Sequence, residues 1–189
     1  MPVAKISVMA DETTGGDRTH RVRPARPADL PHLAPIEDSG GPQFEAYFGE
    51  AIHPVLLSPA PDGRQRAREP GFLLVWAPVE ESPPVGFVHV LVIDGHAHLE
   101  QLSVLPERQR RGIGATLVRA AMAEARAQGF DRLSLCTYRD VPWNGPYYRS
   151  LGFSEVTDLA PYEQRLRDKE RELGLDVNGV RCVMEVALG

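Results

Sequence analysis

The hydrophobic pattern is clearest in the middle of the chain, where three apolar runs have the length of β-strands. These runs cover residues 72–76, 85–93 and 96–104, and the third alternates with a period of two. Asp94 and Gly95, which separate the last two runs, form a dipeptide typical of tight hairpins. The pattern therefore predicts an antiparallel meander of three strands.

A helix with one apolar face is predicted shortly after the meander. Between residues 115 and 128 the apolar positions recur with helical spacing, and Gly129 is a typical helix terminator. Because a strand-like run follows at 132–138, we expect a crossover connection that makes this strand parallel to the one at 96–104. The later pattern predicts helices at 145–151 and 161–173 and strands at 153–156 and 180–186.

The pattern before the meander is less regular. A short strand is expected at 22–26, followed by a helical pattern that should be bent or broken by Pro31 and Pro35. Gly-Gly-Pro at 40–42 ends that unit. The next segments predict a short helix within 43–57 and a surface loop at 58–71, which is rich in Pro, Gly and charge.

Length and composition fit one folded domain with a polar extension. The 189 residues include 42% apolar and 25% charged positions, which is ordinary for a globular protein. Residues 1–20 lack apolar periodicity, so we expect a disordered tail followed by a single domain over residues 21–189. The formal charge of −5 argues against nucleic acid and against an anionic membrane as partners.

The cysteines and the hydropathy pattern favour a cytoplasmic location. Cys136 and Cys182 lie in strand-like runs without metal-ligand spacing, so we expect reduced, buried thiols and no metal. The apolar runs are shorter than the roughly 18 residues that a membrane span requires. The apolar stretch at 6–10 is too short for the core of a signal peptide.

A basic loop with two glycines joins the third strand of the meander to the helix. Gly112 and Gly114 let a bound anion approach the backbone, and the first turn of a helix leaves N–H groups without intrahelical partners. The loop lacks the Lys and Ser/Thr of a Walker A motif, and Leu117 stands where a dinucleotide fingerprint needs a small residue. The pattern predicts a phosphate or pyrophosphate site of another kind. Positive charge comes from Arg108, Arg110 and Arg111.

Two segments resemble motifs of a known family. Residues 102–114 contain Gln109, Gly112 and Gly114 in the order Q-x-x-G-x-G, and residues 147–153 read Tyr-Tyr-Arg-Ser-Leu-Gly-Phe. Both resemble the GCN5-related N-acetyltransferase (GNAT) superfamily, over about residues 21–156. The resemblance implies the GNAT fold, an α/β (α+β) arrangement. Its mixed, mostly antiparallel sheet should have about six or seven strands, a splayed parallel pair and flanking helices.

The resemblance also implies acetyl-CoA as the co-substrate, and no metal. The pantetheine arm would pair with the backbone of Leu102, Ser103 and Val104 as an added strand. Asn144 would bind the pantetheine amide or cap the helix at 145–151, because it stands closer to Tyr148 than the family's Asn usually does. The pyrophosphate would lie on loop amides, at a site formed by Gln109, Arg110, Arg111, Gly112, Ile113, Gly114 and Ala115.

The implied reaction is N-acetyl transfer from acetyl-CoA to a primary amine by direct attack in a ternary complex. An amine with a pKa near about 10.4 is protonated at neutral pH, so a base is needed. The family's positions for it correspond to Glu100 and His98, which should face one side of the strand unless a bulge intervenes. A backbone N–H within 102–104 should stabilise the oxyanion. Tyr148, in preference to Tyr147, should donate a proton to the leaving thiolate.

The acceptor and the oligomeric state stay open at this stage. The acceptor pocket should involve residues 37–57 and 157–180, and the acceptor is an amine on a small molecule or a peptide. The loop at 140–143 is expected to be exposed, with Trp143 lining that pocket or packing as a lid. The helix at 161–173 would support a homodimer or merely cover the sheet. Acids that would suit a cationic amine are Glu37, Asp38, Glu45 and Glu50.

Two other functions compete with acetyl transfer. A regulatory or interaction module on the same fold would bind acyl-CoA without turnover. A protein of another fold could use the glycine loop for a nucleotide phosphate. Glu100 and Tyr148 favour the enzyme, because a module needs neither a base nor a proton donor.

Overall fold

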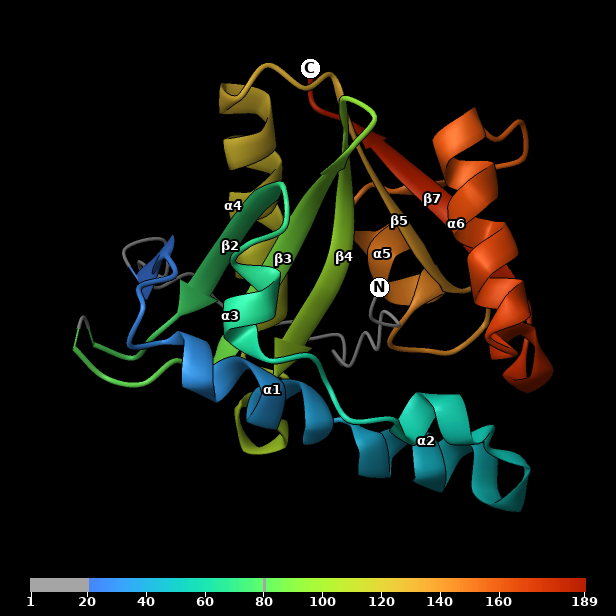
Figure 1. The fold of residues 1–189 in the computed structure, drawn as a ribbon, viewed down its shortest axis with the longest axis horizontal. Helices are drawn as coiled ribbons and strands as arrows, with labels where there is room; N and C mark the ends of the chain where they lie inside the picture. The colour runs from blue at the N-terminus through green and yellow to red at the C-terminus, as the bar shows by residue number, and fades with distance from the viewer. Residues whose placement is uncertain (1–20, 80) are drawn as a thin grey trace.

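A seven-stranded sheet lies at the centre of the structure, a computed structural model that describes residues 21–79 and 81–189. The tail expected at residues 1–20 lies outside the described residues. The strand order is β1-β2-β3-β4-β5-β7-β6, and helices pack on both faces (Figure 1). This confirms the predicted mixed, mostly antiparallel sheet. The strands are β1 (Val22–Pro24), β2 (Gly71–Trp76), β3 (Gly86–Ile93), β4 (His96–Val104), β5 (Arg132–Tyr138), β6 (Ser154–Val156) and β7 (Arg181–Ala187).

The predicted meander is formed by β2, β3 and β4. Both of its connections are antiparallel, and the β3–β4 hairpin turns at Asp94 and Gly95. The two turn residues have φ values of 50° and 80°. Positive φ at both positions is what a type I′ turn requires, and Asp-Gly adopts it readily.

Helix α4 (Ile113–Ala127) packs along one face of the sheet. It begins slightly earlier than predicted, because Gly112 serves as its N-cap with φ 72°. Its apolar stripe is fully buried at Leu117, Val118 and Ala121. These side chains share one core with Leu99 of β4 and residues of β3 and β5.

Shorter helices occupy the other face. α1 (Leu30–Asp38) and α3 (Gly63–Arg66) lie in front of the meander strands in Figure 1, and α2 (Gly41–Phe48) continues from α1. α6 (Pro161–Glu172) lies beside β7, so segments far apart in the sequence lie over the same face of the sheet. α5 (Gly145–Ser150), which follows β5, packs instead on the α4 side, where Tyr147 and Tyr148 join the core under α4.

Of the two outcomes predicted for the first helix, bent or broken, the break is wrong. α1 is continuous, with Pro31 in its first turn and Pro35 inside it. Proline is tolerated in a first turn because the N–H there has no intrahelical partner, whereas Pro35 costs one hydrogen bond. Burial of Leu33 and Ile36 under the sheet offsets that loss.

The segment 58–71 is not simply a surface loop as predicted. It contains α3, whose Arg66 has a side chain only 1% exposed. Arg66 forms an ion pair with Glu37 of α1, which is also 1% exposed. A buried charge is stable only with a partner. Glu37, expected as a surface acid for an amine, is therefore already neutralised by Arg66.

The predicted parallel pair, β4 and β5, separates soon after the strands meet. In the described residues they pair at Ala97↔Leu133, His98↔Ser134 and Leu99↔Leu135. Beyond these positions β4 follows β3 as far as Val104, and β5 follows β7 as far as Tyr138. The edges that face each other after this split have no strand partner among the described residues.

A β-bulge in β4 lies at the start of the split. The β3–β4 register shifts between His89 and Val90, which leaves Glu100 as the extra residue. The bulge reverses the alternation of side chains, so the core under α4 receives Ala97 and Leu99 before it and Leu102 and Val104 after it. The opposite face is left with His98, Glu100, Gln101 and Ser103.

We expect Leu117→Ala to destabilise the protein by about 2–5 kcal/mol, because a fully buried side chain is removed and a cavity remains. Arg119→Ala, on the exposed side of α4, is the matched control and should change the free energy of unfolding by less than about 0.5 kcal/mol. Urea unfolding measures both. Equal stability of the two variants would contradict the described packing of α4.

Candidate active site

Glu100, one of the two predicted bases, is buried where β4 leaves β5. It is 5% exposed, and burial raises the pKa of its carboxyl to about 7. The Arg66 guanidinium lowers that pKa, whereas the carboxylates of Glu170, Glu69 and Glu37 raise it. A carboxyl that titrates near neutrality can accept a proton at physiological pH and release it again.

His98, the other predicted base, is a neutral imidazole beside Glu100. Burial lowers its pKa to about 4, with smaller effects from Glu170, which raises it, and Arg181, which lowers it. Its Nδ1 lies 2.8 Å from Oγ of Ser134, and its Nε2 lies 3.9 Å from Oε2 of Glu100. The two candidates therefore face the same side of β4, and Glu100 is the one whose charge changes near neutral pH.

The predicted phosphate loop passes twice through left-handed backbone before α4. Arg110 has φ 55° and Gly112 has φ 72°, and such turns point successive N–H groups into one concave site. The amides of Ile113, Gly114 and Ala115 belong to the first turn of α4, where intrahelical partners are missing. Together with the helix dipole, this backbone suits a diphosphate.

Gln109 ties this loop to the end of β4. Its Nε2 donates a hydrogen bond of 3.0 Å to the carbonyl oxygen of Val104. Thr116 secures the other side, where its hydroxyl donates to the carbonyl of Gly112 at 2.9 Å. The side chains of Arg110 and Arg111 are exposed, so they lie where a further phosphate group could be reached from solvent.

The predicted pantetheine strand, residues 102–104, has its side chains committed to packing. Leu102 and Val104 are buried in the core under α4, and the Ser103 hydroxyl accepts a hydrogen bond of 2.8 Å from Gln101. One backbone edge pairs with β3, while the other faces the split from β5. An amide-bearing ligand would therefore be recognised here by backbone groups, as an added strand.

Tyr148, the predicted proton donor, is fully buried on α5. Its hydroxyl has no hydrogen-bond partner in the part of the chain that the structure describes, and the same holds for Tyr147. Burial raises the pKa of both phenols, so both keep their protons at neutral pH. A buried, unpaired hydroxyl is unusual and costs free energy, and it is the kind of group that a bound ligand satisfies.

Asn144 stands at the N-cap of α5, but its side chain does not cap the helix. Its Oδ1 instead accepts a hydrogen bond of 3.1 Å from the Thr137 hydroxyl on β5. Asn144 therefore occupies the predicted N-cap position, but the prediction that its side chain caps the helix is wrong. Asn144 is 1% exposed and links α5 to the strand that borders the split.

The loop at 140–143 is exposed only in part: Asp140 and Pro142 are exposed as expected, whereas Val141 and Trp143 are buried. Trp143 is 7% exposed and packs against Phe44 of α2, with ring centroids 5.8 Å apart. Tyr138 and Phe48 belong to the same aromatic group. Trp143 thus joins α2 to the β5–α5 connection as a packing residue, which is one of the two roles that the sequence left open.

Several polar residues at the site were missed from the sequence. Arg66, Glu170, Ser134 and Tyr162 surround Glu100 and His98 through charge or hydrogen bonds. Ser134 gave a weak signal, as a polar residue inside an apolar strand run. The others come from α3 and α6, which nothing in the local pattern places over β4.

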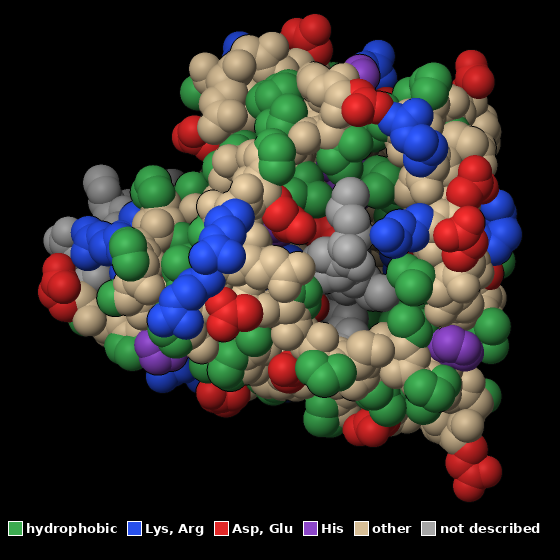
Figure 2. Space-filling view, in the orientation of Figure 1, with side chains coloured by type: hydrophobic (Ala, Val, Ile, Leu, Met, Phe, Trp, Pro, Cys, Tyr) green, Lys and Arg blue, Asp and Glu red, His purple; other side chains and the backbone are tan. Residues whose placement is uncertain are grey.

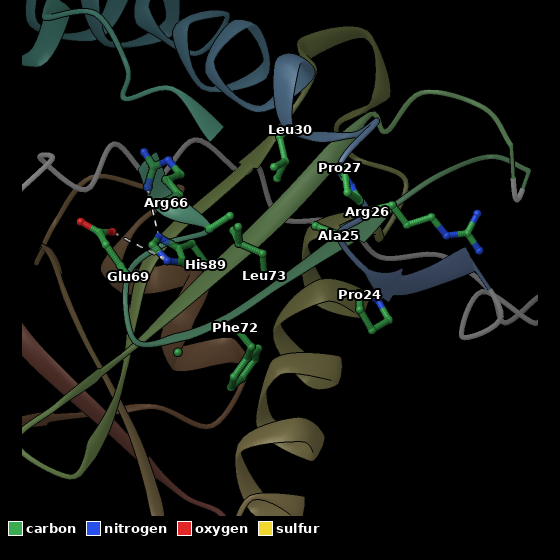
Figure 3. A pocket seen from close by; sticks show the side chains of 12 residues that line it. Pro24, Ala25, Arg26, Pro27, Leu30, Arg66, Glu69, Phe72, Leu73 and His89 are labelled. Atoms are coloured by element: carbon green, nitrogen blue, oxygen red, sulfur yellow. Dashed lines mark hydrogen bonds and ion pairs between the residues drawn. The ribbon is translucent and has the colours of Figure 1, made fainter. Parts of the chain in front are cut away.

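A cavity of about 340 Å3 opens beside this site, at the edge of β2. Figure 3 shows Arg66, Glu69 and His89 facing one another at its polar end, with Phe72 and Leu73 among its apolar walls. Arg66 lies 3.3 Å from Nδ1 of His89. Burial lowers the pKa of His89 to about 3, so the cavity borders a neutral imidazole between two charged groups.

The charges on the surface and the grouping of side chains bear on three other kinds of partner: a polyanion, a metal ion and a membrane. Figure 2 shows acidic and basic side chains interspersed on the face that carries α1, α2 and α6, which suits a small ligand at a local site more than a long polyanion. In the described residues, no three His, Cys, Asp or Glu side chains gather as a metal site. None of the described helices is long and apolar enough to cross a bilayer.

Solved structures of acetyltransferases share this fold. N-acetylglutamate synthase from Neisseria gonorrhoeae, in complex with coenzyme A and N-acetyl-glutamate, is 17% identical with a TM-score of 0.60, over 89% of this chain and 35% of that one. The ribosomal-protein-S18-alanine N-acetyltransferase from Escherichia coli is 19% identical with a TM-score of 0.57, over 89% and 93%. A GNAT family acetyltransferase from Brucella melitensis, in complex with acetyl-CoA, is 26% identical with a TM-score of 0.50, over 70% and 81%.

The family comparison covers the site itself. The model of the acetyltransferase (GNAT) family matches residues 42–153, which include β4, the phosphate loop, α4 and Tyr148. This is more than half of the chain, and it confirms the resemblance found in the sequence. The chain belongs to the acetyltransferase (GNAT) family.

Proposed function

We propose that the protein is an acetyl-CoA-dependent N-acetyltransferase that acts on a primary amine by direct attack in a ternary complex. The observation that carries this proposal is Glu100, a buried carboxyl with a pKa of about 7 at the split between β4 and β5. A module that only binds acyl-CoA has no use for such a group, whereas amine acetylation requires a base.

The residues at the split fit acetyl-CoA. The loop and first-turn amides of residues 110–115 would hold the diphosphate, and the edge of β4 that faces the split at 102–104 would hold the pantetheine amides. When bound, acetyl-CoA supplies the thioester whose C–S bond breaks as the C–N bond forms. The backbone N–H groups of that edge are suited to stabilise the negative charge that develops on the acyl oxygen.

Glu100 and Tyr148 would handle the protons. Glu100 accepts a proton from the ammonium form of the acceptor, which leaves a nucleophilic amine. Tyr148, whose buried phenol stays protonated, donates to the leaving sulfur and regains a proton from the second one that the nitrogen loses as the amide forms. His98 remains neutral beside Glu100. It therefore adds no positive charge that would repel an ammonium group or pair with the Glu100 carboxylate.

The acceptor class we propose is a primary amine carried by a small molecule or a peptide. Of the carboxylates that raise the pKa of Glu100, Glu37 is paired with Arg66 and Glu170 with Arg181. The remaining one, Glu69, and Glu100 itself when ionised supply the negative charge that favours an approaching cation. The two cysteines are free and buried, in keeping with the cytoplasmic location that we propose.

We expect Glu100→Gln to lower kcat by roughly 10²–10⁴-fold, because it removes the base. Glu172→Gln, an exposed substitution on α6, is the control. In the unsubstituted protein kcat should rise with pH and level off above about pH 7, because the base must be ionised. Thiol release measured across pH with a library of amines tests this. A Glu100→Gln variant that keeps both the rate and the pH dependence would contradict the role of Glu100.

We expect Tyr148→Phe to lower turnover more than acetyl-CoA affinity, because the substitution removes only the proton donor. Tyr47→Phe, at a half-exposed ring of α2, is the control. Calorimetric titration gives the affinity, and thiol release gives kcat. Equal losses of both quantities would speak against proton donation. Tight binding of acetyl-CoA without thiol release for any amine would favour the regulatory module instead.

A further inference from the structure

A continuous row of buried polar groups begins at His98 and leads away from the split. His98 Nδ1 lies 2.8 Å from the hydroxyl of Ser134 on β5. The hydroxyl of Tyr162 on α6 lies 3.1 Å from that of Ser134 and 3.2 Å from Oε1 of Glu163. These four side chains come from three elements, and each residue is at most 4% exposed.

The far end of this row reaches the surface. Glu163 shares a side-chain hydrogen bond with Glu185 of β7, and Glu185 accepts a hydrogen bond of 3.0 Å from Arg132. The Glu185 side chain is 18% exposed and that of Arg132 is 67% exposed. Two adjacent carboxyls readily share one proton and exchange it with solvent.

The hydroxyls of the row have more than one acceptor. Tyr162 can donate to Ser134 or to Oε1 of Glu163, and Ser134 can donate to the Ala97 carbonyl at 3.4 Å or to Tyr162. When Tyr162 donates to Glu163 and Ser134 to Tyr162, His98 Nδ1–H can donate to Ser134. A neutral imidazole with its proton on Nδ1 has a lone pair on Nε2. Nε2 is the atom that faces Glu100, at 3.9 Å.

We propose that His98, Ser134 and Tyr162 form a proton relay that carries the proton accepted by Glu100 to the Glu163–Glu185 carboxyl pair. The proposal rests on the proposed function, in which Glu100 is the base. Glu100 is nearly buried, and two bound substrates would cover it further, so a path through the protein lets it be deprotonated before the products leave.

Each transfer in the relay breaks one bond to hydrogen and forms one. Glu100 gives its proton to His98 Nε2, and His98 gives its Nδ1 proton to the Ser134 hydroxyl. Ser134 in turn gives its own proton to Tyr162, and Tyr162 gives its proton to Glu163. Glu100 ends as a carboxylate and the Glu163–Glu185 pair holds one more proton, which solvent removes. Because 3.9 Å exceeds a hydrogen bond, the first transfer needs a small shift of Glu100 or one bridging water. The row resets after the products leave, when the Ser134 and Tyr162 hydroxyls turn back and His98 exchanges its Nε2 proton for one on Nδ1 through water.

The charged groups around the row come from several elements, and ion pairs hold Glu37 with Arg66 and Glu170 with Arg181. Glu100 is faced by Arg66, Glu37 and Glu69 from the α1–α3 side and by Glu170 from α6. His98 is faced by Glu170 and Arg181, which form an ion pair with each other. Glu163 is faced by Glu185 and accepts from the Ala160 amide at 2.9 Å.

The test is Tyr162→Phe, which removes one hydroxyl from the row and keeps the ring that stacks on His96. We expect kcat to fall by roughly 10–100-fold, at or below the low end of what proton-transfer catalysis contributes. Small bases such as imidazole should restore the rate in proportion to their concentration, while acetyl-CoA affinity stays unchanged. Ser134→Ala breaks the same row and should behave alike, which keeps the test valid if Tyr162→Phe folds poorly.

Tyr138→Phe is the matched control, because it also removes a buried phenol hydroxyl, one that donates to the Leu175 carbonyl at 2.8 Å. It should show neither the loss of rate nor the rescue. Turnover of Tyr162→Phe and Ser134→Ala at the unsubstituted rate, or a loss that imidazole does not restore in folded protein, would overturn the relay. Glu100→Gln separates the two proposals. If that variant keeps its activity, Glu100 is not the base and the proposed function is contradicted as well. If Glu100→Gln loses its activity while Tyr162→Phe keeps the unsubstituted rate, only the relay is contradicted.

Discussion

The parting of β4 from β5 after three residue pairs is the constraint on which the rest of the site depends. Each strand keeps its outer neighbour, so the sheet stays continuous, while within residues 21–79 and 81–189 the two inner edges have no strand partner beyond the split. Unpaired backbone is costly when it is covered without a ligand, and it is an advantage where a ligand supplies the missing strand. The bulge at Glu100 lies at this point and reverses the alternation of side chains along β4. The strand therefore keeps apolar side chains on its core face and places polar side chains on the opposite face.

The electrostatics of the site follow from burial. Desolvation raises the pKa of Glu100 to about 7 and lowers that of His98 to about 4. Two side chains that are neighbours on one strand therefore take different roles, one as a group that changes charge and the other as a neutral partner. Ion pairs keep the remaining buried charges in place, Arg66 with Glu37 on one side and Arg181 with Glu170 on the other.

The fold and the cofactor loop were predictable because their signals are local. The hairpin follows from Asp94 and Gly95, and the loop and helix follow from a short motif between residues 109 and 127. The places of Arg66 and Tyr162 at the site could not be predicted, because their partners are distant in the sequence. Arg66 pairs with a residue 29 positions away, and Tyr162 with one 28 positions away. Amphipathic patterns predict which face of a helix is buried but not which distant side chain it meets.

The most direct measurement is a calorimetric titration of the purified protein with coenzyme A, ATP and NAD. If the free edge of β4 and the amides after Gly112 hold the co-substrate, coenzyme A should bind clearly more tightly than the two nucleotides. Gly112→Ala should weaken that binding, because φ is 72° at this position and a side chain is strained there. Absence of heat with coenzyme A, or equal affinity for all three compounds, would contradict the account.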